Sequence, residues 1–520
     1  MHQRTTLALA ALLCPLALKA QTPTLSAPAG QVYTLTLDQA LTTAKANNPL
    51  YRQALNAAAP ASWGVKSAWG NLLPSFGVSG GLSYTGSGQA NLGQGVVAPQ
   101  PISAQTGSSY SAGFQYLLNG STILAPGQSK ANKAAVTETI LEQENLLRAD
   151  ISTQYLEVKR TGAQVIVAQR QVERNQQFLD LTNAKNRVGQ GTLLEVKQAE
   201  VSLGLAKVEV LRQVQLFNEA KLELFRRMGV KPPAPLDQIS LADSFPVVQP
   251  EWRLDSLLSL AESQNPSLRS LKARESVASY GVSSAKTEFL PSLSANAGWS
   301  GFTQQYTNEG LLISQSLSGA QSTAANCNFQ NDVILGLTYG PSGIPGQPNG
   351  GLIADCNSYA NLNSTGTALT PAYQQQIVDQ NSKWPFQFTG QPFFASVTIS
   401  LPVFQGFSRA LRVSQAKQQQ LDADESLRAR DLQLQADVTG RYLGLNSAYE
   451  AIGVQKSNMD AAGEQLRLAQ DRYRLGSGNA LEIADAQNGL QQAEGQYVNA
   501  IFVYHEAIVA LEAAVGHPLR

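Results

Sequence analysis

The chain has few charged residues and few of the residue types that build catalytic or metal sites. Only 15% of its 520 residues are charged, and 38 basic residues balance 38 acidic ones. This balance excludes nucleic-acid binding through bulk charge. The sequence holds only 3 histidines, of which His505 and His517 lie near its end without a third ligand close by. We therefore expect neither a metal site nor a cofactor.

Long apolar runs are also scarce. Beyond the N-terminal segment we find no run approaching the ~20 apolar residues that a transmembrane helix needs, so a membrane span would have to be built from strands. Residues Thr5 to Leu18 form a short apolar run behind Arg4, which predicts a secretory signal peptide over residues 1–20. Residues 21–35 would follow as an extended N-terminal segment.

Cysteine is equally rare. Of 3 cysteines, Cys14 lies in the predicted signal peptide, which leaves Cys327 and Cys356 in the exported chain. Leu13 precedes Cys14, where a lipidation signal requires a small residue, so we do not expect a lipid anchor. An oxidising location favours a disulfide between Cys327 and Cys356, and two unpaired thiols are the alternative.

The most informative feature that is present is an internal repeat. Residues 37–75 begin with Leu-Asp and end with Leu-Pro-Ser, and this pattern recurs over residues 254–292 at an offset of 217. Farther along, Arg187-Val-Gly-Gln-Gly recurs as Arg474-Leu-Gly-Ser-Gly at an offset of 287. The second copy therefore carries an insertion of about 70 residues. We expect a first repeat at 36–229, a proline-rich connector at 230–250, a second repeat at 251–516 and a C-terminal end at 517–520.

Each copy is predicted to begin with helix and to continue with strands. The opening helical stretches, Leu37 to Asn71 and Leu254 to Phe289, are both interrupted by Asn-Pro, which ends one helix and starts the next. After Leu-Pro-Ser the period changes to two, with apolar residues on one face and mostly Ser and Gly on the other. A return strand follows in each copy. The predicted strands cover residues 75–84, 110–116, 292–300 and 393–401.

A very long helix follows the strands in each copy, over Ser129 to Arg187 and Gln415 to Arg474. Apolar residues in both follow spacings of four and three, which are typical of a coiled-coil seam. They are Ile151, Tyr155, Val158, Val165, Val172 and Leu179 in the first copy and Val438, Tyr442, Leu445, Ile452, Met459 and Leu466 in the second.

Glycine pairs interrupt the long helices. Gly189 and Gly191 end the first long helix, Gly476 and Gly478 end the second, and a further helix follows each pair. Glycine at a helix end admits the left-handed conformation that lets the chain reverse. Each copy is therefore predicted to carry a helical hairpin.

The extra residues of the second copy lie between its two strands. Residues from about 303 to 390 are rich in Gly, Asn, Gln and Ser, and they contain Cys327 and Cys356. This composition is typical of a long surface loop.

Four strands with one apolar face cannot close a barrel within one chain. Known membrane barrels need at least ~8 strands and tolerate no open edge in lipid. Closure would require two chains or three, and the residues alone allow either. The coiled-coil seams need partners for a similar reason.

Four kinds of motif follow one another along the chain: the doubled Leu-Asp opening with Asn-Pro, the Leu-Pro-Ser before each first strand, the single Leu401-Pro-Val-Phe-x-Gly exit and the two Arg-x-Gly-x-Gly turns. This ordered set resembles the TolC-like outer membrane efflux proteins. The resemblance implies an α+β membrane protein in which three chains, with four strands each, build a 12-stranded outer membrane β-barrel. The barrel would continue into a long α-helical coiled-coil tunnel in the periplasm.

The resemblance also implies function and partners. The protein would be a passive channel, not an enzyme, and would serve as the exit duct of a tripartite efflux or type I secretion system. Its partners would be two further copies in a homotrimer, a periplasmic adaptor (membrane fusion) protein, an inner membrane pump and outer membrane lipid, with no nucleic acid. The location would be the outer membrane of a Gram-negative type bacterium, with the chain extending into the periplasm and the insertion at about 303–390 forming an extracellular loop. The adaptor would dock at the glycine turns.

Acidic residues follow the second glycine turn. Leu481, Glu482 and Asp485 match the periplasmic constriction of the family, so the resemblance implies that both carboxylates line the aperture and that Leu481 is a candidate hydrophobic gate. The alternative is that acids in a first helical turn only complement the helix dipole. In the first copy Glu195 stands at the place of Glu482, but Gln198 replaces Asp485. This asymmetry favours gating by the second hairpin.

Tyr473 matches a tyrosine of the network by which family members hold the aperture closed. That network also includes an arginine just past the glycine turn, where this chain has Gly478. Arg474 or Arg187 would have to supply the cation instead, with Glu195 as a further member. We hypothesise that Tyr473 and Arg474 help to hold the closed state.

A coiled-coil scaffold without a pore is the main alternative function. It does not explain why four separate strands alternate in matching fashion. An exported hydrolase is a further alternative, because Gly77-Val-Ser-Gly-Gly formally matches a nucleophile elbow. That motif lies within an alternating strand and lacks a convincing base, which argues against catalysis.

Overall fold

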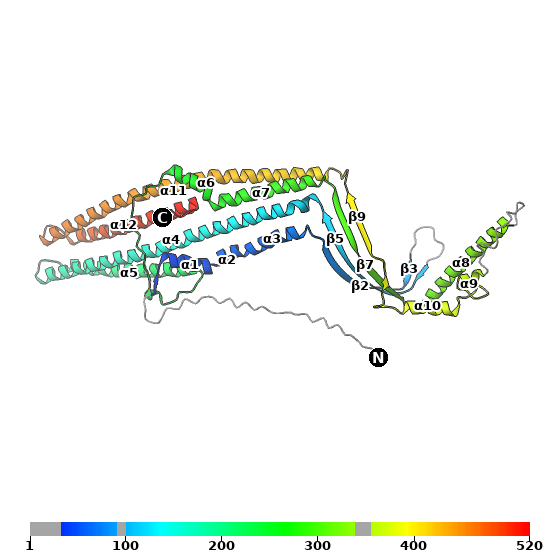
Figure 1. Cartoon of the computed structure of the whole chain (residues 1–520). Coiled ribbons are helices and arrows are strands. Elements are labelled where there is room, and N and C mark those ends of the chain that lie inside the picture. Colours follow the sequence, from blue (N-terminus) through cyan, green and yellow to red (C-terminus); the bar gives the residue numbers. More distant parts are fainter. Residues whose placement is uncertain (1–32, 91–99, 339–354, 520) are drawn as a thin grey trace, which may run out of the picture. The chain divides into compact units, whose positions relative to one another are not determined.

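The computed structural model describes residues 33–90, 100–338 and 355–519. The predicted signal peptide, residues 1–20, lies outside these ranges, as does most of the segment 21–35. The chain divides into two units. Figure 1 shows the whole chain in colours that follow the residue number. The helical unit comprises Met1–Ser67, Leu124–Ala285 and Ala410–Arg520, and the strand unit comprises Ala68–Ile123 and Lys286–Arg409.

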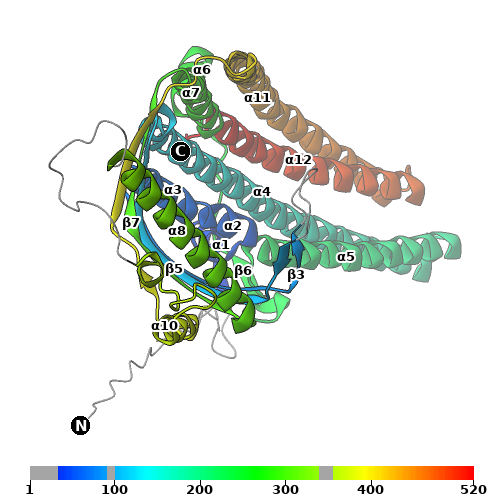
Figure 2. The same cartoon turned by 90° about the vertical axis from the view of Figure 1, so that its right-hand side faces the viewer.

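Four long helices form two antiparallel pairs (Figure 1 and Figure 2). The first pair is α4 (Gly120–Arg187) with α5 (Leu193–Met228), and the second is α11 (Ser408–Arg474) with α12 (Ala480–Val515). Both pairs confirm the predicted hairpins. The first helix of each pair begins earlier than the predicted Ser129 and Gln415. α4 also runs through Pro126, which removes one helical hydrogen bond without ending the helix.

α12 corrects one expectation from the sequence. By length and composition it could cross a membrane, since its best window has a mean hydropathy of 1.5. No apolar run of that kind was expected after the signal peptide. Of its apolar residues, Ile508, Leu511 and Val515 are buried in the core of the helical unit, and 33% of the window is buried in all.

Shorter helices precede the strands of each copy, and asparagine caps divide them. They are α1 (Leu37–Asn47), α2 (Pro49–Asn56) and α3 (Ala58–Gly70) in the first copy and α6 (Leu254–Gln264) and α7 (Pro266–Thr287) in the second. The Oδ1 atom of Asn48 accepts from the Tyr51 amide at 3.0 Å, and that of Asn265 accepts from the Leu268 amide at 3.2 Å. The predicted Asn-Pro breaks are therefore confirmed.

The predicted seams are confirmed in part. Ile151, Tyr155 and Val158 are fully buried, and so are Val438 and Leu445. Other predicted seam positions are only partly buried, namely Val165, Val172, Leu179, Tyr442 and Met459. In the half of α4 that leads to the glycine turn, other residues are buried instead, namely Val167, Ala168, Gln171, Asn175 and Phe178. The contact face of α4 therefore shifts along its length and becomes more polar towards the glycine turn.

The connector contains an element that the sequence did not indicate. β6 (Ile239–Leu241) pairs in parallel with β1 (Tyr33–Leu35), after the short 3-10 helix η1 (Leu236–Gln238). The hydroxyl of Tyr155 donates to the Leu35 carbonyl at 2.9 Å and to Asp243 Oδ2 at 2.6 Å. The connector is thereby fixed to α4.

The strand unit is an antiparallel sheet, and its four main strands confirm the predicted ones. They are β2 (Ser75–Thr85), β5 (Gln105–Leu118), β7 (Ser292–Tyr306) and β9 (Phe394–Ser400), with the short β8 (Thr389–Gly390) also along β7. Phe76 lies opposite Phe114, Phe114 opposite Ala297, and Ala297 opposite Ala395. The apolar positions of all four strands therefore share one face. A small extra hairpin, β3 (Gly88–Ala90) with β4 (Gln100–Ile102), was not expected.

The insertion is helical, which corrects the prediction of a long loop. It contains α8 (Glu309–Thr338), α9 (Cys356–Tyr359) and α10 (Pro371–Asn381). The Gly-, Asn-, Gln- and Ser-rich composition indicated a loop, but the apolar residues within it follow a helical spacing of four and three. The positions concerned are Ile313, Leu317, Ala320, Ala324 and Cys327, which line the small core of the insertion or bond to it.

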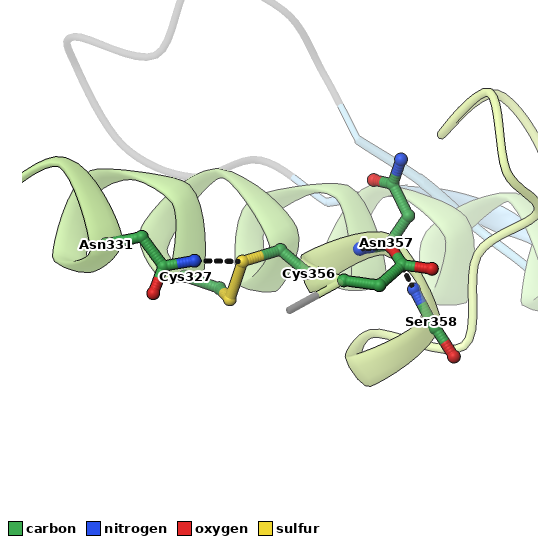
Figure 3. Close-up of a disulfide and its surroundings, with 6 residues drawn as sticks. Cys327, Asn331, Cys356, Asn357 and Ser358 are labelled. Atoms are coloured by element: carbon green, nitrogen blue, oxygen red, sulfur yellow. Dashed lines mark hydrogen bonds between the residues drawn. A yellow bond between two sulfur atoms is a disulfide. The ribbon is translucent and has the colours of Figure 1, made fainter. Parts of the chain in front are cut away.

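A disulfide joins Cys327 of α8 to Cys356 of α9, with their Cα atoms 5.7 Å apart (Figure 3). The Nδ2 atom of Asn331, one turn farther along α8, donates to Cys356 Sγ at 3.2 Å. The Asp355 carboxylate caps α9 by accepting from the Asn357 and Ser358 amides. The short α9 is therefore held by a covalent bond and by its cap.

Candidate functional site

Both helical pairs reverse direction at the predicted glycines. Gly189 has a φ of 76° and Gly476 a φ of 78°, which is the left-handed region that favours glycine. At Gly191 and Gly478 the neighbouring atoms of the turn leave little room for a side chain. A Cβ at Gly478 would lie 3.0 Å from the backbone nitrogen of Tyr473, so a side chain there would crowd the turn.

Lys185 and Tyr473 connect the two turns. Lys185 Nζ, near the end of α4, donates to the backbone carbonyl of Tyr473 and lies 4.1 Å from the centre of its ring. Phe178 packs edge-on against the same ring at 5.7 Å. Tyr473 is only 3% exposed, and its hydroxyl makes no hydrogen bond within the described residues. Burial raises the pKa of Tyr473, and the nearby Glu195 carboxylate raises it further.

The predicted aperture residues lie at the start of α12. Asn479 caps the helix by accepting from the Glu482 amide at 2.9 Å, while Glu482 Oε2 lies 3.2 Å from Arg472 Nη1. Leu481 is 62% exposed. Asp485 is also exposed and has no hydrogen bond or ion pair within the part of the chain that the structure describes. Its carboxylate is therefore free to face a pore or a cation.

The first copy uses its acid differently. The Glu195 amide donates to Thr192 Oγ1 at 3.2 Å, and Glu195 Oε2 accepts from the Thr192 amide at 2.9 Å. This reciprocal capping box occupies the carboxylate locally. Gln198, at the place of Asp485, is exposed and uncharged. Asp485 is thus an additional carboxylate that only the second turn carries.

Neither Arg474 nor Arg187 forms a side-chain hydrogen bond or ion pair with Tyr473 among the residues that the structure describes. Arg474 Nη1 lies 3.7 Å from Asp471 Oδ1, and Arg187 is exposed. The cation at Tyr473 is Lys185, which the sequence did not indicate because the two residues are 288 positions apart. The role of Tyr473 and Arg474 in a closed state stays a prediction.

A polar network joins the pairs farther from the turns. Arg174 donates through Nη1 and Nη2 to the Glu494 carboxylate at 3.1 and 2.9 Å, and through Nε and Nη2 to Gln171 Oε1 at 3.0 and 2.8 Å. Gln171 donates to Asn175 Oδ1 at 3.2 Å, and Asn175 donates to the Ser202 carbonyl at 3.0 Å. The network therefore ties α12 to α4 and α5, and no local sequence pattern could have revealed it.

Comparison with known proteins places this fold. A family model described as outer membrane efflux protein matches residues 40–230 and 371–517. Among curated proteins no relative matches. Solved structures with the same fold include VceC from Vibrio cholerae, with 15% identity, 93% of this chain and 97% of that chain covered, and a TM-score of 0.63.

Two further channels align over similar lengths. CmeC from Campylobacter jejuni is 13% identical to this chain, and the alignment covers 95% of this chain and 91% of CmeC with a TM-score of 0.65. The open state of MtrE from Neisseria gonorrhoeae is 18% identical, and the alignment covers 95% of this chain and 94% of MtrE with a TM-score of 0.61. Since the family model matches more than half of the sequence, the chain belongs to the outer membrane efflux protein family, whose members are transport proteins of the Gram-negative outer membrane that extend into the periplasm.

Proposed function

We propose that three copies of this chain build a 12-stranded barrel and a helical tunnel, and that this assembly is the passive exit duct of a tripartite efflux or type I secretion system. The repeats at 36–229 and 251–516 would each supply two strands and one helical pair to the wall. A periplasmic adaptor would dock at the turns around Gly189 and Gly476, and an inner membrane pump would supply the energy.

The observation that carries the proposal is the continuous apolar face of the strand unit. Val78, Leu82, Val397 and Ile399 are each at least 70% exposed on this face in the single chain. Among the described residues, β2 and β9 each pair on one side only. Exposed apolar faces suit lipid, but open edges do not, so the edges must pair with other copies.

Exposed apolar side chains on α11 indicate missing helical neighbours. Leu421, Leu432, Leu443 and Val454 are each more than half exposed and recur every 11 residues. A period of 11 keeps such a stripe almost parallel to the helix axis. A stripe of this length fits packing against a helix of another copy.

Asp485 is the proposed electrostatic gate. In a trimer, Asp485 and Glu482 would form rings of carboxylates, which attract cations at a narrow opening. Arg472 already pairs with Glu482, so Asp485 would supply the larger part of the unpaired charge. The choice between three chains and two rests on the family.

Conductance of the purified protein in planar bilayers tests the proposal, with wild type compared with Asp485→Ala. We expect ion current from both, a larger current from the variant, and weaker block by divalent cations. Gln198→Ala is the matched control, because it changes the equivalent position of the first turn without removing charge.

The possible outcomes separate the parts of the proposal. Absence of current from every form would exclude the channel and favour the scaffold without a pore. Current that is equal in wild type and Asp485→Ala would exclude only the gate. Mass measurement of the detergent-solubilised complex would contradict the trimer if it gave two copies.

A further inference from the structure

The end of the insertion crosses the apolar face of the sheet. The segment Trp384–Phe388, named here the crossing segment, leaves α10 and leads into β8. Ser108 Oγ on β5 donates to the Pro385 carbonyl at 2.6 Å. The Phe388 ring packs edge-on against Tyr110, two residues along β5, with ring centres 4.9 Å apart. Ser108 and Tyr110 alternate with the polar positions of β5, so the segment lies on the apolar side.

Next to the crossing segment, the Tyr110 ring lies over a glycine of the neighbouring strand. Gly301 of β7 is buried, and a Cβ added to it would lie 2.4 Å from Tyr110 Cε1 and 2.7 Å from the Thr389 carbonyl. Its neighbours on the same face, Ser108 and Thr303, are only 5% and 4% exposed. By contrast, Leu82 lies directly opposite Ser108 in the register and is 76% exposed. The crossing segment therefore covers one end of a face that is otherwise open.

The crossing segment turns one aromatic side chain, that of Phe386, outward. Phe386 is 80% exposed, and exposed Lys383 precedes the segment. An exposed apolar ring suits the acyl region of a bilayer, and a nearby lysine can bury its aliphatic stem there while its ammonium stays among the headgroups. We propose that the crossing segment is a lipid anchor, in which Phe386 enters the acyl region of the outer leaflet and Lys383 stays among the headgroups. The anchor rests on the proposed function, because it requires the apolar sheet face to meet lipid.

Lipid fits this surface better than a second copy of the chain does. Copies of the chain would join through the edge strands β2 and β9, whereas the crossing segment contacts the face of β5, an inner strand of the sheet. The paired positions Leu82, Ser108 and Thr303 carry no charged residue between the exposed Leu82 and the part of the face that the crossing segment covers. A single lipid-facing surface therefore runs from the sheet onto Phe386.

Depth measurement in vesicles tests the anchor. With Cys327 and Cys356 bonded and Cys14 in the predicted signal peptide, single cysteines can be labelled with a fluorophore. The variants are Phe386→Cys, Leu82→Cys as the lipid reference at the same strand level, and Ser83→Cys as the reference on the opposite face. Quenching is measured with phosphatidylcholine that carries a nitroxide on its acyl chain, and separately with iodide in the water.

We expect the label at 386 to be quenched by the lipid nitroxide as the label at 82 is, and the label at 83 to be quenched by iodide. Iodide quenching at 386 with lipid quenching at 82 would overturn the anchor and leave the channel standing. Protection of 386 from both quenchers would also overturn it and would indicate protein contact. Iodide quenching at both 82 and 386 would overturn the anchor and the lipid-facing sheet together.

Discussion

Arg174 and Glu494 are joined by a two-point ion pair that links α4 to α12. The guanidinium Nη1 and Nη2 atoms lie 3.1 and 2.9 Å from the two carboxylate oxygens, and the side chains are 16% and 13% exposed. A paired geometry of this kind, largely shielded from water, gives stronger hydrogen bonds than a surface pair. Since the pair lies between the helical pairs, any outward movement of α11 and α12 must break it.

Removing this ion pair is expected to favour the open channel. Arg174→Met leaves the Glu494 carboxylate without its main cation, at a cost of about 1–3 kcal/mol to the contact between α4 and α12, which we expect to belong to the closed state. Bilayer conductance should rise in Arg174→Met and in Glu494→Gln. The exchange of both residues, Arg174→Glu with Glu494→Arg, should restore part of the wild-type value.

A second ion pair serves as a control, because it lies within one helical pair and not between the two pairs. Arg227 of α5 pairs with Asp150 of α4 within the first helical pair. Arg227→Met should therefore lower thermal stability without raising conductance. If Arg227→Met and Arg174→Met raised conductance equally, the special role of the link between the pairs would be excluded.

Tyr473 is expected to act through its ring and not through its hydroxyl. The ring contacts Lys185 and Phe178, whereas the buried hydroxyl has no hydrogen-bond partner within the described residues. Tyr473→Phe should leave conductance unchanged and change the free energy of unfolding by less than about 1 kcal/mol. Tyr473→Ala should cost about 3 kcal/mol by leaving a cavity, and should raise conductance.

Lys185→Met separates the cation from the ring. We expect a conductance between those of wild type and Tyr473→Ala, because the contact to the carbonyl and ring of Tyr473 is lost while packing is kept. Arg474→Met serves as the comparison, since Arg474 contacts Asp471. A larger effect from Arg474→Met than from Lys185→Met would favour the closed-state role originally expected of Arg474.

The disulfide is expected to stabilise the insertion and not the channel. Replacing Cys327 and Cys356 with serine removes the bond between α8 and α9 and should destabilise this part by about 2–4 kcal/mol. Limited proteolysis should then cut the insertion faster, with bilayer conductance unchanged. Loss of conductance in the double variant would show that the insertion supports the pore.

The ionisation of Glu506 on α12 is expected to lower the free energy of unfolding as pH rises. Burial raises its pKa above the usual 4.5, a contribution from Glu157 adds to this, and Arg160 partly opposes it. A raised pKa means that the folded state holds the proton more tightly, so stability present below pH 4.5 is lost as pH rises through the folded pKa. Glu506→Gln should therefore be more stable than wild type at neutral pH in thermal denaturation.

Glu223 provides the opposite case. Hydrogen bonds from Arg226 and Arg227 lower its pKa to about 2, so its contribution is present above the ordinary value and is lost as pH falls towards 2. Glu223→Gln should lower stability at neutral pH slightly, because the carboxylate is partly exposed and its ion pairs are screened by solvent. Shifts of the same sign in both variants would contradict this assignment.

The local sequence predicted the elements of the repeat well. Alternation over residues 75–84 predicted β2, Asn48 and Asn265 predicted the helix breaks, and Gly189 and Gly476 predicted the turns. Each of these features depends on side-chain direction, capping or backbone freedom within a few residues. The insertion was predicted wrongly because its composition was weighed above its helical spacing.

The sequence by itself determined which segments are strands, helices and turns, and the family motifs indicated a channel. Only the tertiary structure decided which side chains meet across the helical pairs. Lys185 meets Tyr473 over 288 positions and Arg174 meets Glu494 over 320. Such contacts depend on how two helices are rotated and packed against each other, and no local period encodes that rotation. The parallel pairing of β1 with β6 and the contacts of residues 384–388 with Ser108 and Tyr110 were decided in the same way, by packing between distant segments.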